Sequence, residues 1–253
     1  MNLSALWIAG RFLTRFPFPD PGPIGAADLG RAVPWYPAIG LLLGLALTLT
    51  AALAGPWWIG GPAPAVAALT LALWAWLTGG LHLDGLADSA DAWIGGMHSR
   101  ERTLEIMKDP TSGPAGVSTL ALLLILKFAC LQALIAAGNP TALLWVPLLA
   151  RAQLPLLLIS TPYARPQGMA GDPAHHAPRA ACRLSVALAA GAAGWALGAW
   201  GWLALAAAAA LFWLVRRALL ARIQGFTGDT AGALVELTEA LVLLVLALGL
   251  GAG

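Results

Sequence analysis

Long apolar runs separated by short polar segments dominate the chain. A membrane-spanning helix needs about 20 mostly apolar residues, and runs close to that length occupy residues 36–54, 64–81, 115–136, 141–160, 184–199, 201–215 and 231–250. The fifth and sixth runs are short and meet around Gly198–Gly201, which predicts a tight helical hairpin. The pattern predicts an all-α fold: a polytopic integral membrane helix bundle with about seven transmembrane helices.

The first apolar stretch, residues 3–18, differs from the others because Arg11 and Arg15 interrupt it. This alternation of apolar and charged residues favours an interfacial or re-entrant helix over a full span. The stretch has no cleavage site of small residues, so we do not expect a removed signal peptide.

Composition supports the membrane assignment. Hydrophobic residues make up 59% of the 253 residues and charged residues only 10%, and the mean hydropathy is +0.78. A soluble domain carries about 25% charged residues, so this surface could not be solvated by water alone. The net charge of +2, without any basic run, excludes nucleic acid as an expected partner. The expected environment is the lipid bilayer.

The cations are distributed unevenly between the predicted loops. Segments 55–63, 137–140, 198–201 and the tail after 250 contain no Lys or Arg. Of the 14 cations, Lys127 and Arg151 lie inside predicted spans, and the other twelve fall on the opposite side: Arg11, Arg15, Arg31, Arg100, Arg102, Lys108, Arg165, Arg179, Arg183, Arg216, Arg217 and Arg222. By the positive-inside rule that side is cytoplasmic, with the N-terminus in and the C-terminus out.

The densest polar motif is GGLHLDGLADSADAW, residues 79–93. Its aspartates Asp84, Asp88 and Asp91 are spaced i, i+4, i+7, which places them on one helical face. Like charges on one stripe repel each other unless a cation lies between them, and hard oxygen ligands suit Mg²⁺ or Mn²⁺. We predict these three residues as metal ligands. His82 is a candidate either to donate to a phosphate or to take part in proton transfer. The alternative is a solvated helix end.

Two further motifs follow. In IMKDPTSGPAG, residues 106–116, Lys108 and Asp109 precede a Pro/Gly turn, and a lysine beside turn amides is a workable phosphate contact. Three roles are open for Asp109: metal ligand, base or helix cap. The non-functional alternative is that the whole segment is an ordinary juxtamembrane turn. In GFTGDTAGALVELTE, residues 225–239, Asp229 opens the last span and Glu236 follows at i+7.

Carboxylates inside a span are costly unless paired or metal-bound, so Glu236 is a functional candidate by default. Glu239 is expected to pair with a cation, and Arg151 in the fourth span is either its partner or a phosphate contact.

These three motifs, together with FLTRFPFP (residues 12–19) and PWYPAIG (residues 34–40), occur in an order that resembles the adenosylcobinamide-GDP ribazoletransferase family, also called cobalamin synthase. The resemblance extends from about residue 6 to residue 246. It implies a multi-pass enzyme of the bacterial inner membrane with its active site facing the cytoplasm, and a single membrane-embedded catalytic domain over residues 1–253.

The resemblance also implies a reaction. The enzyme would join adenosylcobinamide-GDP to α-ribazole, or to its 5′-phosphate, and release GMP, with Mg²⁺ as cofactor. Homo-oligomers or association with other late enzymes of the cobalamin pathway are further expectations. We expect catalytic roles for Asp229, Glu236 and His82; the expected substrate or phosphate contacts are Lys108, Arg151, Arg15 and Asp109.

Two other functions fit parts of the pattern. A membrane phosphotransferase of the CDP-alcohol type also uses spaced aspartates, but its Asp-Gly-x-x-Ala-Arg signature needs an arginine where this chain has Asp88. A cation-coupled transporter places acids near mid-membrane in paired, broken helices. Here the acids concentrate on one side, and the two halves of the sequence show no repeat.

Overall fold

The computed structural model of the chain describes residues 3–55, 58–165 and 171–250. Within these ranges the regular structure is helical, apart from one bridge between Tyr163 and Phe226. The helices are α1 (Leu3–Leu13), α2 (Ala26–Ala32), η1 (Val33–Trp35), α3 (Tyr36–Ala54), α4 (Ala63–Leu77), α5 (Leu81–Gly95), α6 (Arg100–Ile106), α7 (Pro114–Ala136), η2 (Pro140–Leu144), α8 (Trp145–Ser160), α9 (Gly171–His176), α10 (Arg179–Ile223) and α11 (Gly228–Gly249).

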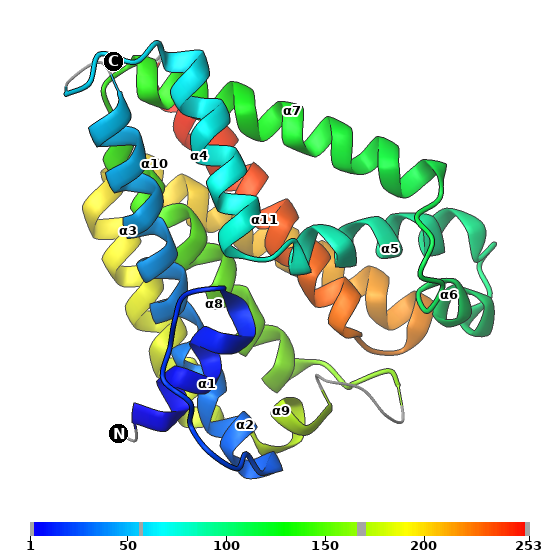
Figure 1. Cartoon of the computed structure of the whole chain (residues 1–253). Helices are drawn as coiled ribbons and strands as arrows, with labels where there is room; N and C mark the ends of the chain where they lie inside the picture. Colours follow the sequence, from blue (N-terminus) through cyan, green and yellow to red (C-terminus); the bar gives the residue numbers. More distant parts are fainter. Residues whose placement is uncertain (1–2, 56–57, 166–170, 251–253) are drawn as a thin grey trace.

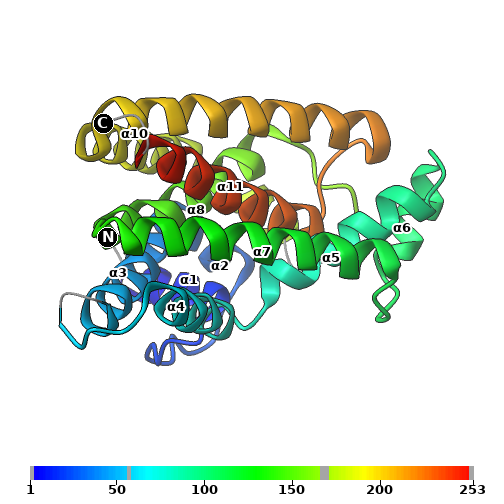
Figure 2. The same cartoon turned by 90° about the horizontal axis from the view of Figure 1, so that it is seen from above.

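Helix α11 occupies the middle of the bundle. It contacts α5, α7, α8 and α10, and Figure 2 shows it running between α7 and α10. On the other side of α8, α3 packs closely through Gly40 and Gly44. A Cβ at either glycine would lie 2.3 Å from the carbonyl oxygen of Pro147 or of Leu144. Small residues at i and i+4 are a usual way for membrane helices to approach each other.

Helix α10 contains the predicted hairpin. Its 45 residues are interrupted at Gly198, which has φ 60° and ψ −140°. A Cβ on Gly201 would lie 2.8 Å from the carbonyl oxygen of Ala193, eight residues earlier. In a straight helix these positions would be about 12 Å apart, so the chain folds back on itself here. The hairpin around Gly198–Gly201 is confirmed.

The polytopic helical architecture is also confirmed. Among the described residues, five helices are long and apolar enough to cross a membrane, or six if α4 and α5 form one broken span. The expected seven counted the two arms of α10 separately, whereas this count takes α10 as one helix. Helix α1 has 11 residues, about 16 Å, and is too short to span. It ends at Leu13, earlier than the predicted stretch 3–18.

The predicted span 64–81 was wrong at its end. Helix α4 stops at Leu77, and α5 leaves it at an angle of 86°. The bend uses Gly79 and Gly80, whose φ values of 65° and 70° are those that residues other than glycine rarely adopt. The bend therefore redirects the aspartate motif across the bundle instead of along it (Figure 1).

Arginine side chains hold the segments at one end of the bundle together. Arg100 donates to the carbonyl oxygens of Ile223 (3.2 Å) and Ala164 (3.1 Å). Arg222 donates to the hydroxyl of Thr103 at 2.9 Å. At the opposite end, the Trp200 ring lies against Gly249, 2.7 Å from where its Cβ would be. The predicted cation-free tail after residue 250 lies outside the described residues.

Candidate active site

The aspartate motif and the last span meet where α5 crosses α11. A Cβ on Gly85 would lie 2.9 Å from the Cα of Asp229, and a Cβ on Gly232 would lie 3.2 Å from the Cα of His82. Glycine on each helix thus permits near backbone contact. This contact places Asp84, the neighbour of Gly85, beside Asp229. The sequence motifs are 145 residues apart when counted from Asp84 to Asp229 (229 − 84), and only the fold brings them together.

A cavity of about 290 Å³ opens at this crossing. Asp84, Asp229, His82 and Arg165 supply its charged and imidazole groups. Most of the remaining wall is apolar or aromatic: Phe12, Leu13, Tyr36, Leu81, Leu154, Leu158, Tyr163, Pro173, Gly228, Ala231 and Gly232. We call it the carboxylate cavity. An apolar pocket with a few convergent polar groups is the usual form of a small-molecule site.

Arg165 is the cation of this cavity. Its Nη2 lies 2.8 Å from Oδ2 of Asp229, and the two side chains are 17% and 23% exposed. The Thr227 hydroxyl, 3.3 Å away, donates to the same oxygen. The Nε of Arg165 is buried without a hydrogen-bond partner. The sequence identifies Arg165 only as a loop cation, because no spacing along the chain relates it to Asp229.

Asp88 extends the acidic surface by one turn of α5. It is half-buried, and its carboxylate interacts electrostatically with those of Asp84, Asp229 and Asp91 and with the Arg165 guanidinium. Among the described residues, the groups that interact with Asp88 are these three carboxylates and one guanidinium, so the region is short of positive charge. Such a region favours the binding of a cation.

Asp91 faces a different neighbour. Its Oδ2 accepts from the Gly113 amide at 2.7 Å and its Oδ1 from the Gly116 amide at 2.9 Å. It therefore caps the N-terminus of α7, and a Cβ on either glycine would lie within 2.6 Å of its carboxylate. Among the described residues, no three His, Cys, Asp or Glu side chains converge as a ready metal site. Metal ligation by Asp84, Asp88 and Asp91 stays a prediction.

The second motif lies beside the cavity without lining it. Lys108 and Asp109 are exposed at the end of α6, where Arg165 also reaches the carbonyl oxygen of Met107 at 3.5 Å. Hydrogen bonds from the Thr111 hydroxyl and amide hold the pKa of Asp109 below its usual value. Asp109 thus closes a local turn with Thr111, whereas the residue at the N-cap of α7 is Gly113.

Arg15 is exposed at the α4–α5 bend. Its backbone amide donates to the Leu77 carbonyl oxygen at 2.7 Å, and its Nε would lie 2.8 Å from a Cβ on Gly79. Phosphate contacts by Arg15, Lys108 and Asp109 stay predictions.

A buried charge network lies deeper in the bundle than the cavity. It consists of Lys127 on α7, Arg151 on α8, and Glu236 and Glu239 on α11. Lys127 Nζ is 2.5 Å from Oε2 of Glu236 and also contacts Glu239. Arg151 contacts the other oxygen of Glu239. No side chain of the four is more than 4% exposed. The expected Arg151–Glu239 pair is present, and Arg151 does not line the carboxylate cavity.

His82 connects the network to the cavity. It is 3% exposed, lines the cavity, and its Nδ1 lies 3.3 Å from Nη2 of Arg151. A guanidinium only donates, so Nδ1 must accept and the ring proton belongs on Nε2. His82 in this arrangement is a neutral donor. Of the two roles open in the sequence, the geometry favours donation to a phosphate.

Comparison with known proteins identifies the family of the chain. A sequence profile described as "Cobalamin-5-phosphate synthase" matches residues 5–247. The chain belongs to the cobalamin-5-phosphate synthase family.

Similar relatives of this family include proteins named adenosylcobinamide-GDP ribazoletransferase. The one from Ectopseudomonas mendocina (strain ymp) is 52% identical over 96% of this chain and 98% of its own. The one from Pseudomonas paraeruginosa is 50% identical over 97% and 98%. No solved structure matches the chain. The resemblance carried by the motifs is confirmed, and the two rival readings are set aside.

Glu236 lies apart from the other acidic candidates. The sequence suggested a catalytic role for it together with Asp229. The structure pairs Glu236 with Lys127. Glu236 is 3% exposed and does not line the cavity. The physical reason is that a carboxylate this far inside a bundle requires a counter-charge, and Lys127 on α7 supplies it. Asp229, in contrast, does line the cavity, and so does Asp84.

Proposed function

We propose that the protein joins adenosylcobinamide-GDP to α-ribazole, or to its 5′-phosphate, and releases GMP in cobalamin biosynthesis. The observation that carries the proposal is the carboxylate cavity, in which Asp84 and Asp229 meet Arg165 and His82 in a chain of this family. Phosphoryl transfer depends mainly on positioning and electrostatic stabilisation. Paired acids, one arginine and one imidazole donor are suitable residues for that task.

The reaction is one substitution at phosphorus. The ribose hydroxyl oxygen of α-ribazole attacks the phosphorus on the cobinamide side of the diphosphate. A new P–O bond to the ribose forms while the anhydride P–O bond breaks, and GMP departs with its electron pair. The hydroxyl proton passes to a carboxylate. We assign that role to Asp229, because it lines the cavity and Arg165 at 2.8 Å holds its orientation.

His82 and the apolar wall complete the arrangement. The Nε2–H of His82 donates to a phosphoryl oxygen, which stabilises the charge that develops there. Arg151 fixes that tautomer from behind. The wall formed by Tyr36, Leu154 and Leu158 suits the aromatic base of α-ribazole and keeps water from the reacting atoms.

Mg²⁺ is the cofactor we propose, and the residues fit it. Mg²⁺ commonly binds through one or two carboxylates and completes its shell with substrate phosphates and water. Asp84 and Asp88, one helical turn apart and electrostatically coupled, would hold the ion. When bound, it neutralises the charge of the diphosphate.

We also propose that the protein lies in the bacterial inner membrane with the carboxylate cavity facing the cytoplasm. The one-sided distribution of cations supports this orientation. An Asn139→Cys variant should react with an impermeant thiol reagent from outside intact cells, and Glu101→Cys should react only after permeabilisation. The reverse pattern would overturn the orientation.

Turnover tests the proposed activity directly. Purified protein in lipid nanodiscs is supplied with adenosylcobinamide-GDP, α-ribazole and Mg²⁺, and GMP release is followed by chromatography. GMP should form only when both substrates are present. Folded protein that releases no GMP would refute the proposal. A CDP-linked alcohol offered in place of adenosylcobinamide-GDP should yield no CMP.

A further inference from the structure

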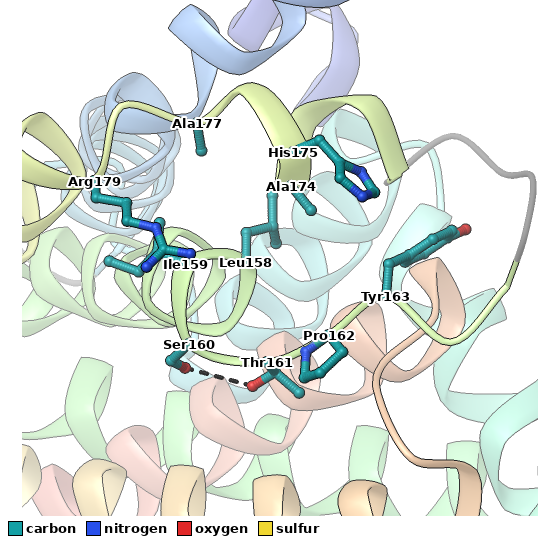
Figure 3. A pocket seen from close by; sticks show the side chains of 10 residues that line it. All are labelled: Leu158, Ile159, Ser160, Thr161, Pro162, Tyr163, Ala174, His175, Ala177 and Arg179. Carbon is teal, nitrogen blue, oxygen red and sulfur yellow. Dashed lines mark hydrogen bonds between the residues drawn. The ribbon is translucent and has the colours of Figure 1, made fainter.

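A second cavity, of about 440 Å³, lies next to the carboxylate cavity. It is lined by the end of α8, the extended segment after it, α9 and the start of α10. Figure 3 shows its ten lining residues: Leu158, Ile159, Ser160, Thr161, Pro162, Tyr163, Ala174, His175, Ala177 and Arg179. We call it the polar cavity. Its volume is in the range of small-molecule sites.

The chemistry of the polar cavity differs from that of its neighbour. Arg179 lies at one end and His175 and Tyr163 at the other, with the hydroxyls of Ser160 and Thr161 between them (Figure 3). None of the ten lining residues is acidic. Behind them, Arg216 donates to the Ser160 carbonyl oxygen at 2.7 Å and to the Thr161 hydroxyl at 3.1 Å. The cavity therefore suits a polar, anionic ligand.

Tyr163 connects the two cavities. It lines both, together with Leu158, and Arg165, two residues later, belongs to the carboxylate cavity. The segment is fixed by two backbone hydrogen bonds, from Ala164 to Phe226 (2.8 Å) and from Phe226 to Pro162 (2.9 Å). The Tyr163 ring also packs edge-on against Phe226, with ring centroids 5.3 Å apart. A wall held this firmly offers a preformed aromatic surface.

We propose that the polar cavity binds the guanosine monophosphate part of adenosylcobinamide-GDP, so that the diphosphate passes over Tyr163 into the carboxylate cavity. This inference rests on the proposed function, because it divides that substrate between two adjoining spaces. The attacked phosphorus must lie near Asp84 and Asp229. The leaving nucleotide then needs an adjacent space without carboxylates. Arg179 there faces an anion, and the Tyr163 ring offers a surface for the guanine to stack on.

The test measures nucleotide binding without turnover. GMP is titrated into the full-length protein in nanodiscs by isothermal calorimetry, with wild type, Arg179→Gln and Arg183→Gln compared. Both arginines are exposed on α10, so neither change should impair folding. Arg183 lies one turn further along and does not line the cavity. Arg179→Gln should weaken GMP binding about tenfold, the loss of one charge-assisted contact. Arg183→Gln should bind like wild type.

Steady-state kinetics separate this placement from the proposed function. Arg179→Gln should raise KM for adenosylcobinamide-GDP about tenfold while KM for α-ribazole stays unchanged. If wild type turns over normally and Arg179→Gln changes neither GMP binding nor either KM value, the polar cavity is not the GMP site. The proposed function would still hold in that case. An increase in KM for α-ribazole instead would assign the polar cavity to the other substrate and also overturn the placement. Wild type that releases no GMP would refute the proposed function.

Discussion

Helix α11 carries two charged regions that use the same residue types in different ways. Near its start, Asp229 pairs with Arg165, and both side chains are partly exposed, 23% and 17%. About two to three turns further on, Glu236 and Glu239 join Lys127 and Arg151 in a network in which no side chain is more than 4% exposed. The first region opens into a cavity, and the second is sealed inside the bundle.

The role of a carboxylate in this bundle therefore depends more on its ion-pair partners and on whether it reaches a cavity than on its position in a sequence motif. In the buried charge network, two acids meet two cations, so the charges are balanced within the protein. At the carboxylate cavity, Asp84 and Asp229 line the wall, and Asp88 lies one turn further along α5. Among the described residues, Arg165 is the cation that interacts with Asp88. The unbalanced region is the one that benefits from a bound cation or substrate. The balanced region holds α7, α8 and α11 together.

Replacement of one cavity carboxylate should have the largest effect on catalysis. Asp84→Asn removes charge without changing shape, and GMP release should fall about 10³-fold, the upper range for loss of one charge-stabilising contact. The matched control is Asp20→Asn, an exposed loop aspartate whose side chain accepts from the Gly22 amide; its activity should match wild type. Activity of Asp84→Asn within tenfold of wild type would remove the distinction between the two regions.

The buried charge network should govern stability. Lys127→Met leaves two buried glutamates without one of their cations and should cost about 3–5 kcal/mol of unfolding free energy. Denaturant unfolding of purified protein measures it. Adding Glu236→Gln to Lys127→Met should recover part of the loss, because the uncompensated charge is removed. Arg102→Met, which breaks an exposed pair with Glu105, should leave stability nearly unchanged. A Lys127→Met protein as stable as wild type would contradict the structural role.

Magnesium should stabilise the cavity region. At about 100 times its Kd, Mg²⁺ should add about 2.7 kcal/mol to the folded state, seen as a higher Tm in nanodiscs. The increase should be greater at pH 8 than at pH 5.5, because protons compete with the metal for the carboxylates at the lower pH. Asp84→Asn should abolish most of it. An equal shift in that variant would mean that the ion binds elsewhere.

Asp91→Asn should have the smallest effect. Weakening the cap on α7 should cost about 1 kcal/mol of stability, and GMP release should fall less than tenfold. The comparison with Asp84→Asn is informative because both residues belong to one spaced motif. Inactivation as complete as that of Asp84→Asn would place Asp91 among the metal ligands, as the sequence predicted.

Much of the fold was accessible from the sequence. The apolar runs predicted α3, α7 and α11 within a few residues, and the hairpin at Gly198 followed from two adjacent short runs. These features are local, because a helix in lipid must satisfy its own backbone hydrogen bonds and so needs a continuous apolar run. The bend at Gly79 and Gly80 was missed because the apolar composition continues through it.

The sequence by itself determined the membrane class, the family and the acidic motifs. The tertiary structure decided which neighbour each acidic residue meets. Asp229 lines a cavity with Asp84, Glu236 pairs with Lys127, and Asp91 accepts hydrogen bonds from the start of α7. It also supplied Arg165, which no spacing in the chain connects to Asp229. Spacing along one helix tells which side chains share a face, whereas the partner of a charge is set by whichever neighbouring helix packs against that face. That choice depends on close approaches at glycines such as Gly85 and Gly232, which become visible only when the helices are packed.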